Sequence, residues 1–291
     1  MQHPKTLLAA GLLLSAASLN AQASLTSYTA NGVDFVRMQG AGFDLSFTKD
    51  GNLFQTLANS YAGGASSFVT AVIDASGGKI TDTPNAYDSP ANSGYHTLTS
   101  SDFNTSTGSV SWFGAKAYVN YLNSVSYGGS HQWALPTWTD TGASGPQYAN
   151  SGTDAGYNIN PSTDPLAQLY FGELSKKAYL DTSGNIQNGY GIFGNDGAQV
   201  AGGAVGPFTN VQSYAYWLGT EYAPYPDDAW YFITSYGGFQ YGNFKDRPLY
   251  AWAVSPGLVA SAPAAVPVPG AVWQFGTGLL GLLGLLNRRK A

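Results

Sequence analysis

Two apolar segments, one near each end of the chain, confine the folded part to the residues between them. Near the N-terminus the segment Leu7–Leu19 leads into Ala21-Gln22-Ala23. Small residues such as Ala21 and Ala23, at positions −3 and −1 of a cleavage site, fit signal peptidase. An N-terminal membrane anchor is the alternative, but 13 apolar residues fall short of the roughly 20 that span a bilayer. We therefore expect residues 1–23 to be a signal peptide.

The second apolar segment lies near the C-terminus. Gly270–Leu286 is an uncharged stretch of 17 residues, and Arg288, Arg289 and Lys290 follow it. A basic cluster holds its side of a membrane helix in the cytoplasm, so the body is expected outside. Residues 260–269 are rich in Pro and Ala and predict an extended linker.

The body between these segments, residues 24–259, has the size of one domain, with two domains as the alternative. It carries 8 basic and 17 acidic side chains, a net charge of −9. That balance argues against nucleic acid and anionic membrane surfaces as partners, because both attract basic patches. The chain has no cysteine, which excludes disulfides, thiolate metal sites and cysteine nucleophiles. The body must therefore be held by its own core.

The apolar patterning predicts an α+β domain. Two strands are expected over residues 33–38 and 43–47, and residues 59–110 are expected to form long loops with short ordered pieces. Helices are expected over residues 112–123 and over 165–179, with Asp164 as the cap of the second helix. Four later strands are expected over residues 214–220, 229–235, 239–244 and 249–254. Gly237-Gly238 predicts a hairpin between the second and third of these strands.

The C-terminal sequence resembles a PEP-CTERM sorting signal. The match consists of Val-Pro-Val-Pro with Pro267 and Pro269, then Gly270-Ala-Val-Trp273-Gln-Phe-Gly, and the final Arg288-Arg289-Lys290. The usual Glu of the motif is replaced by Val268. The resemblance implies cleavage near the Pro motif by an exosortase, a membrane protease of Gram-negative bacteria, after transient insertion of residues 270–286. It also implies an association with exopolysaccharide or biofilm matrix. A permanent tail anchor is the alternative.

The body resembles the Lcl C-terminal-like domain, which is related to the C-type-lectin-like fold. The matching segments are 44–53, 112–123, 132–137, 216–220, 229–232 and 249–254. Two arginines of the family are absent, because Ala134 and Trp252 or Ala253 stand at their positions. The resemblance implies a lectin-like domain with two helices and a short-stranded antiparallel sheet, and it implies no shared activity.

An acidic loop is the most suggestive group of side chains in the body. It contains Glu221, Asp227 and Asp228, and it is flanked by Trp217 and Trp230. Such a loop could bind Ca²⁺ through oxygen atoms or a sugar through stacking and carboxylate hydrogen bonds. The simpler interpretation is a solvated loop in front of core tryptophans.

Other chemistry-bearing residues have structural interpretations. His96 and His131 lack the spacing of a zinc site, and Ser46-Phe-Thr-Lys49 lacks the companions of a serine–lysine site. Glu173 is expected on a solvated helix face, and Asp181-Thr-Ser-Gly-Asn185 predicts a tight turn. We therefore expect no catalytic residues, no bound metal and no cofactor, with Ca²⁺ as the weak alternative.

The sequence favours an exported, non-enzymatic protein of the cell surface or matrix that binds extracellular polysaccharide. Signal peptidase and exosortase are its expected partners during export. A polysaccharide-acting enzyme that uses Glu221 and an aspartate is one alternative. A surface domain without a ligand is the other.

Overall fold

The computed structural model describes residues 24–139, 150 and 153–260. The predicted signal peptide, with Ala21 and Ala23, lies outside the described residues. So does the predicted sorting segment, with Pro267, Pro269, Gly270, Trp273, Arg288 and Arg289. Among the described residues, no helix has the length and apolar character needed to cross a membrane.

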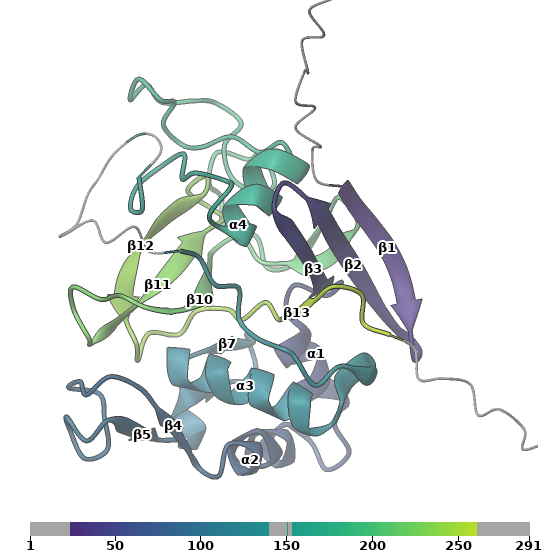
Figure 1. Ribbon diagram of the computed structural model, residues 1–291, viewed down its shortest axis with the longest axis vertical. Coiled ribbons are helices and arrows are strands. Elements are labelled where there is room, and N and C mark those ends of the chain that lie inside the picture. Colours follow the sequence, from purple (N-terminus) through teal and green to yellow (C-terminus); the bar gives the residue numbers. More distant parts are fainter. Residues whose placement is uncertain (1–23, 140–149, 151–152, 261–291) are drawn as a thin grey trace, which may run out of the picture.

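The first part of the body forms an antiparallel sheet that the end of the body completes. Strands β1 (Ser24–Ala30), β2 (Val33–Gly40) and β3 (Phe43–Thr48) follow one another in the chain, and β13 (Val254–Pro256) pairs with β3. Figure 1 shows this sheet on one side of the molecule, with β13 entering from the middle. The two strands predicted over residues 33–38 and 43–47 are confirmed.

A helical layer follows the first sheet. It contains α1 (Leu53–Ser60), α2 (Ala65–Ala75) and α3 (Trp112–Ser124), and α3 confirms the predicted helix. The prediction of long loops over residues 59–110 is wrong at α2. Phe68, Val69 and Val72 recur there at helical spacing and are buried, although the segment is rich in Ser, Thr and Ala. The short hairpins β4 (Lys79–Thr81) with β5 (Tyr95–Thr97), and β6 (Phe103–Asn104) with β7 (Ser109–Val110), connect α2 to α3, with the turn η1 (Ser100–Asp102) between them.

Helix α3 begins at a cap that the sequence supplies locally. The side-chain oxygen of Ser111 accepts a hydrogen bond of 3.0 Å from the backbone N–H of Gly114, which satisfies one of the free amides at the helix start. The same hydroxyl donates to Asp102 Oδ1 at 2.6 Å. The short turn η2 (Tyr127–Gly129) follows the helix.

The second predicted helix is shorter than expected. Helix α4 (Pro165–Ala167) continues into a π-helical turn, η3 (Gln168–Glu173). The predicted cap is confirmed, since Asp164 Oδ1 accepts from the N–H of Leu166 at 2.7 Å. The expected continuation to residue 179 is wrong because Ser175 adopts a left-handed conformation, with φ of 49°, and a residue in that conformation ends a helix. The hairpin β8 (Gly203–Val205) and β9 (Phe208–Val211) precedes the late strands.

The late strands form an antiparallel meander of β10 (Ala215–Glu221), β11 (Asp228–Ile233) and β12 (Phe239–Phe244). The predicted hairpin is confirmed, because the N–H of Gly238 donates to Ile233 O at 2.9 Å. The fourth predicted strand, over residues 249–254, meets this meander only at one bridge, between Tyr250 and Tyr216 of β10. Leu249 bridges to Val110, and the chain then crosses to β3.

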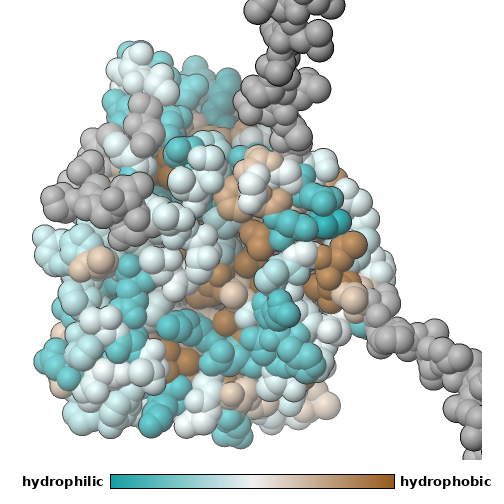
Figure 2. Space-filling model, viewed as in Figure 1, coloured by the Kyte–Doolittle hydropathy of each residue, from teal (hydrophilic) through white to brown (hydrophobic). Residues whose placement is uncertain are grey.

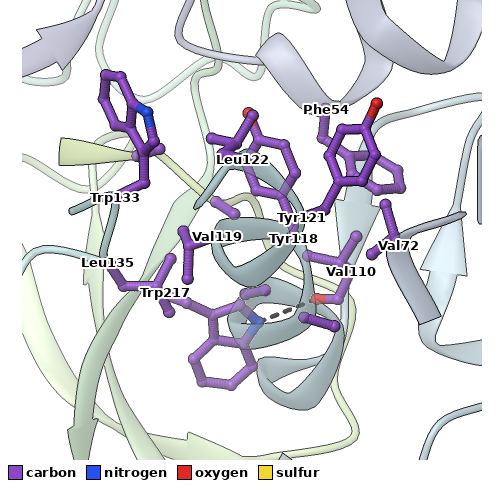
Figure 3. Close-up of a cluster of buried hydrophobic side chains, with 14 of the residues drawn as sticks. Phe54, Val72, Val110, Tyr118, Val119, Tyr121, Leu122, Trp133, Leu135 and Trp217 are labelled. Atoms are coloured by element: carbon purple, nitrogen blue, oxygen red, sulfur yellow. Dashed lines mark hydrogen bonds between the residues drawn. The ribbon is translucent and has the colours of Figure 1, made fainter. Parts of the chain in front are cut away.

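Two buried clusters of apolar side chains support these layers. The first surrounds α3 (Figure 3) and contains Trp112, Tyr118, Leu122 and Trp217; the second lies between the two sheets and contains Phe47, Tyr170, Trp230 and Trp252. Hydrophilic and near-neutral residues cover most of the face shown in Figure 2, and hydrophobic residues gather toward its middle. A cysteine-free body of this size therefore carries two aromatic-rich cores.

Truncation of Leu122 tests the first core. Leu122 is 0% exposed, and we expect Leu122→Ala to lower the free energy of unfolding by about 2–5 kcal/mol because it removes buried methyl groups and leaves a cavity. Val125, one turn further on, is 49% exposed, and Val125→Ala should change the stability by less than about 0.5 kcal/mol. Equilibrium denaturation of both variants measures the difference, and equal losses would contradict the assigned core.

Candidate functional site

The acidic loop predicted from the sequence joins β10 to β11. Glu221 ends β10, Asp228 begins β11, and the tight turn between them is closed by the Tyr222 N–H, which donates to Asp228 O at 3.0 Å. The structure therefore brings Glu221, Asp227 and Asp228 to one end of the late sheet. A second loop, between β4 and β5 (residues 82–94), lies against them.

Two of the three carboxylates hold this β4–β5 loop in place. Glu221 Oε1 accepts from the backbone N–H of Thr83 at 3.2 Å, and Asp227 Oδ1 accepts from that of Ala86 at 2.7 Å. The partners are 138 and 141 residues apart in the sequence. These contacts give both carboxylates a structural role in fixing the loop.

The β4–β5 loop also builds itself from its own side chains. Asp88 Oδ2 accepts from the N–H groups of Asn85 and Gly94, at 3.1 and 2.7 Å. The Asn85 amide donates to Asp82 Oδ2 at 2.8 Å. The loop is therefore a defined platform of carboxylates whose oxygens are largely occupied by protein donors.

A buried lysine that the sequence did not single out lies beneath the acidic loop. Lys245 Nζ lies 2.7 Å from Asp82 Oδ2 and 3.3 Å from Glu221 Oε2. It also lies 4.8 Å from the centre of the Trp112 ring. Lys245 follows β12 and Asp82 follows β4, so no local pattern could have paired them.

Asp228 differs electrostatically from its neighbours. Burial, followed by the nearby charge of Asp227, raises the pKa of Asp228 to about 6, although Lys245 opposes the shift. A carboxyl group with such a pKa can hold a proton close to neutral pH. Asp228 lies beside Glu221 and Asp227, the two carboxylates that hold the β4–β5 loop.

The two tryptophans of the predicted site are core residues. Trp217 is 0% exposed and Trp230 is 3% exposed. Figure 3 shows the indole of Trp217 beneath α3, with its N–H directed to Val110 O at 3.0 Å. Trp230 packs edge-on against Trp138 at 4.6 Å between ring centres. Neither ring presents a face to a ligand, so the stacking role considered for them does not fit their placement.

The described residues contain no group of three or more His, Asp or Glu side chains that could hold a metal ion. The carboxylate of Glu221 already pairs with the ammonium group of Lys245 at 3.3 Å. Asp181 Oδ1 accepts from the N–H groups of Ser183 and Asn185, at 2.8 and 2.9 Å. The predicted tight turn at residues 181–185 is therefore confirmed.

The hydrogen bonds of His96 favour its cationic form. Its Nδ1 lies 2.7 Å from the carbonyl oxygen of Tyr87, and its Nε2 lies 3.1 Å from Asp102 Oδ1. A carbonyl and a carboxylate oxygen accept hydrogen bonds only, so both contacts are made when both ring nitrogens carry protons, and the pKa of His96 is accordingly raised. The ring stacks on Phe113 with 4.0 Å between centres. His131, by contrast, is exposed and contacts Ser126 and the Asn123 carbonyl.

A second region, which sequence reasoning missed, is an uncharged hollow of about 410 Å³. It lies between the β6–β7 hairpin, the residues before β10 and the segment 248–250. Amides, hydroxyl groups and two phenol rings line it: Asn104, Gln199, Gln212, Thr107, Ser109, Ser213, Tyr214 and Tyr250. We call it the tyrosine hollow.

The tyrosines of this hollow are held by the late sheet. Tyr214 is 41% exposed and contacts Tyr250 edge-on, with 6.5 Å between ring centres. Tyr250 donates its backbone N–H to Ala215 O at 2.9 Å. Gln212 is buried, and its amide donates to Asn210 O at 2.9 Å. The hollow thus combines residues held by hydrogen bonds with one well-exposed ring, that of Tyr214, which we call the rim tyrosine.

A third hollow, of about 420 Å³, lies near β2 and β3 and is charged. Its Asp34 and Lys49 side chains form an ion pair of 3.1 Å, and Asp50 Oδ1 accepts from Asn210 Nδ2 at 3.0 Å. Its charges are therefore already matched within the protein. The tyrosine hollow differs because no ionisable carboxylate or amine lines it.

The chain matches no protein-family model, no curated protein and no solved structure.

The protonated state of His96 predicts a pH dependence of stability. Burial acts to lower the pKa of His96, but its hydrogen bonds to Asp102 and to the Tyr87 carbonyl outweigh burial and raise the pKa above 6.5. The stabilisation is complete below the unfolded-state value and is lost as the pH rises through the folded-state pKa. We expect His96→Gln to reduce the loss of stability between pH 6.5 and mildly alkaline pH.

Denaturant titrations at several pH values measure this effect. His131→Gln is the matched control because it removes an exposed ring, and it should leave most of the alkaline loss in place. An unchanged pH profile in His96→Gln would show that the ring is not bound as an imidazolium.

Proposed function

We propose that this protein is an exported, non-enzymatic protein of the cell surface or extracellular matrix that binds neutral extracellular polysaccharide in the tyrosine hollow. The single observation that carries the proposal is the lining of that hollow, which combines amides, hydroxyl groups and two tyrosine rings without any charged side chain. Sugars present hydroxyl groups and apolar C–H faces, which amides and aromatic rings respectively recognise.

The volume of the hollow suits a ligand that contains several sugar rings. Its volume of about 410 Å³ falls within the usual range of ligand pockets. The ring of Tyr214 lines the hollow and is 41% exposed, so a polymer at the surface can reach it. The fixed positions of Gln212 and Tyr250 reduce the entropy that binding must overcome.

The proposed location outside the cell rests on the two terminal segments. The N-terminal segment Leu7–Leu19 is apolar, and Ala21 and Ala23 follow it at the positions that signal peptidase requires. The PEP-CTERM resemblance adds an exosortase as the second processing partner, with residues 270–286 inserted in the inner membrane until cleavage. This route would operate in a Gram-negative bacterium that has a gene cluster for exopolysaccharide synthesis.

We further propose that the body is a member of the C-type-lectin-related Lcl C-terminal-like group. Support comes from the α+β architecture and from the late antiparallel meander of β10, β11 and β12. The first and last described strands, β1 and β13, also share one sheet. The Leu-Pro segment lies beside that last strand, because Ala134 bridges to Val254.

The enzymatic alternative has a less suitable site. Glu221 and Asp82 both lie within hydrogen-bonding or ion-pair distance of Lys245, and the Asp82 side chain is 0% exposed. A glycosidase needs two carboxylates that reach opposite sides of a substrate bond. Glu221 and Asp227 already accept hydrogen bonds from the backbone N–H groups of Thr83 and Ala86. Because these contacts hold the β4–β5 loop, we favour binding without cleavage.

Substitution of the rim tyrosine tests the proposed function. We expect Tyr214→Ala to weaken binding to exopolysaccharide from the source strain about tenfold, because one stacking contact contributes about 1–1.5 kcal/mol. Tyr225→Ala is the matched control, since Tyr225 is 53% exposed but lies outside the hollow. Isothermal titration or a pull-down of the folded body measures the binding, and equal losses in both variants would contradict the assignment.

The release of reducing ends distinguishes binding from catalysis. The wild-type protein should retain the polysaccharide and release no reducing ends over a long incubation. Turnover that disappears in Glu221→Gln would establish the enzymatic alternative. Absence of retention on every polysaccharide tried would favour a surface domain without a ligand.

A further inference from the structure

The Lys245–Asp82 pair is buried to an unusual degree for two charged side chains. Lys245 Nζ lies 2.7 Å from Asp82 Oδ2, and both side chains are 0% exposed. The Lys49–Asp34 pair offers a comparison within the same molecule: its side chains are 34% and 52% exposed. Lysine and aspartate are seldom fully buried, and removing both charges from water costs several kcal/mol per ion.

Aromatic rings lie beside the pair, and one of its oxygen atoms has no hydrogen-bond partner among the described residues. The Trp112 ring centre lies 4.8 Å from Lys245 Nζ, and the Phe113 ring centre lies 6.0 Å from it. The second oxygen of Asp82, Oδ1, has no hydrogen-bond partner among the described residues. A buried ion pair is favourable only when additional hydrogen bonds satisfy its remaining atoms. A reaction that removed both charges would also remove the free-energy cost of burying them.

The main chain holds both side chains in position. The N–H of Lys245 donates to Asp227 O at 3.0 Å, and its carbonyl accepts from the Trp112 N–H at 2.8 Å. The N–H of Asp82 donates to Gly94 O at 3.2 Å. Since Nζ already touches one carboxyl oxygen, the carboxyl carbon lies only one bond further away.

A third ionisable group contacts the same amine. Glu221 Oε2 lies 3.3 Å from Lys245 Nζ, and the Glu221 side chain is 26% exposed. Glu221 therefore connects the closed pair to solvent. A carboxylate in this position can take a proton from an amine and pass it to an oxygen that leaves.

We propose that Lys245 and Asp82 condense into an intramolecular amide, an isopeptide cross-link, with Glu221 as the group that transfers the proton. The nitrogen of Lys245 attacks Cγ of Asp82, so a C–N bond forms and one C–O bond of Asp82 breaks. The three protons of the ammonium group are all accounted for: one stays on the amide nitrogen and two leave with the departing oxygen as water. No oxidant, reductant or co-reactant is required.

Proximity and burial favour this reaction. An amine and a carboxyl group held in contact react with a high effective concentration. Burial raises the pKa of Asp82 above its usual value, although Lys245 opposes this effect. Burial thus favours the protonated acid that an amine can attack, and the 0% exposure of both side chains limits the access of water that would reverse the condensation.

The cross-link would join distant parts of the chain. Asp82 and Lys245 are 163 residues apart, and the bond would tie the β4–β5 loop to the end of β12. Closing a long loop covalently restricts the unfolded chain, as a disulfide does. An exported chain without cysteine would gain by this bond a covalent tie that no reductant opens.

The mass of the denatured protein tests the proposal. The protein, purified in its processed form and denatured, should weigh one water molecule less than the mass calculated for the residues between its mapped N-terminus and its mapped C-terminus. Protease digestion should yield one linked pair of peptides that contains residues 82 and 245. A mass equal to that of the sequence, with the two residues in separate peptides, would overturn the proposal and leave a buried ion pair.

Three substitutions separate the roles. Lys245→Arg keeps the positive charge but should restore the sequence mass, whereas Asp82→Asn should lose ammonia in place of water. Glu221→Gln should leave most of the protein unlinked, and a wild-type extent of cross-linking in this variant would contradict its assigned role. Lys49→Arg changes the exposed comparison pair and should keep the loss of water; loss of the link there would overturn the assignment to Lys245. Should Lys245→Arg not fold, the wild-type peptide map still decides.

Discussion

The segment 249–256 connects parts of the molecule that otherwise have few means of staying together. Leu249 exchanges two backbone hydrogen bonds with Val110, of 2.7 and 3.0 Å. Trp252 donates its indole N–H to Thr48 O at 2.9 Å, and β13 completes the first sheet by pairing with β3. One short segment thus contacts the helical layer, the late sheet and the first sheet. The body has no disulfide, because the chain has no cysteine. These contacts join residues distant in sequence, so they form only when residues 249–256 have reached their place in the fold.

This arrangement separates two regions with different chemistry. At one end of the late sheet, carboxylates and Lys245 satisfy one another and hold the β4–β5 loop. At the other end, the tyrosine hollow keeps amide and hydroxyl groups near the surface without any charge. The carboxylates of the acidic region form hydrogen bonds and ion pairs within the protein. The amide and hydroxyl groups of the hollow line a surface that a ligand could reach. Under the proposed function, the structural contacts and the ligand contacts therefore fall on different side chains.

Much of the fold could be predicted because its elements carry local patterns. The stripe of apolar residues on α3, the alternation in β2 and β3 and the Gly237-Gly238 turn all specify their structures within a few residues. Helix α2 was missed because its Ser and Thr content resembles that of a loop. The fate of residues 249–254 depends on contacts with β3, which no local pattern encodes.

The candidate site was only partly predictable, for a related reason. The acidic residues were found because they are adjacent in the sequence, but the roles of Trp217 and Trp230 could not be read there. The amino-acid sequence does not distinguish a core tryptophan from one that stacks on a sugar. Only the burial of the side chain in the folded protein distinguishes them. The tyrosine hollow gathers segments around residues 104, 199, 212 and 250, so only the folded chain assembles it.

Mapping of ligand contacts on the isotope-labelled body by nuclear magnetic resonance tests the central claim most directly. Upon addition of exopolysaccharide from the source strain, the account predicts that shifted backbone and side-chain signals gather around Tyr214, Tyr250 and Gln212. Signals of the acidic loop should stay in place. Shifts that gather elsewhere on the surface, or their absence at saturating polysaccharide, would contradict the claim that the tyrosine hollow is the binding site.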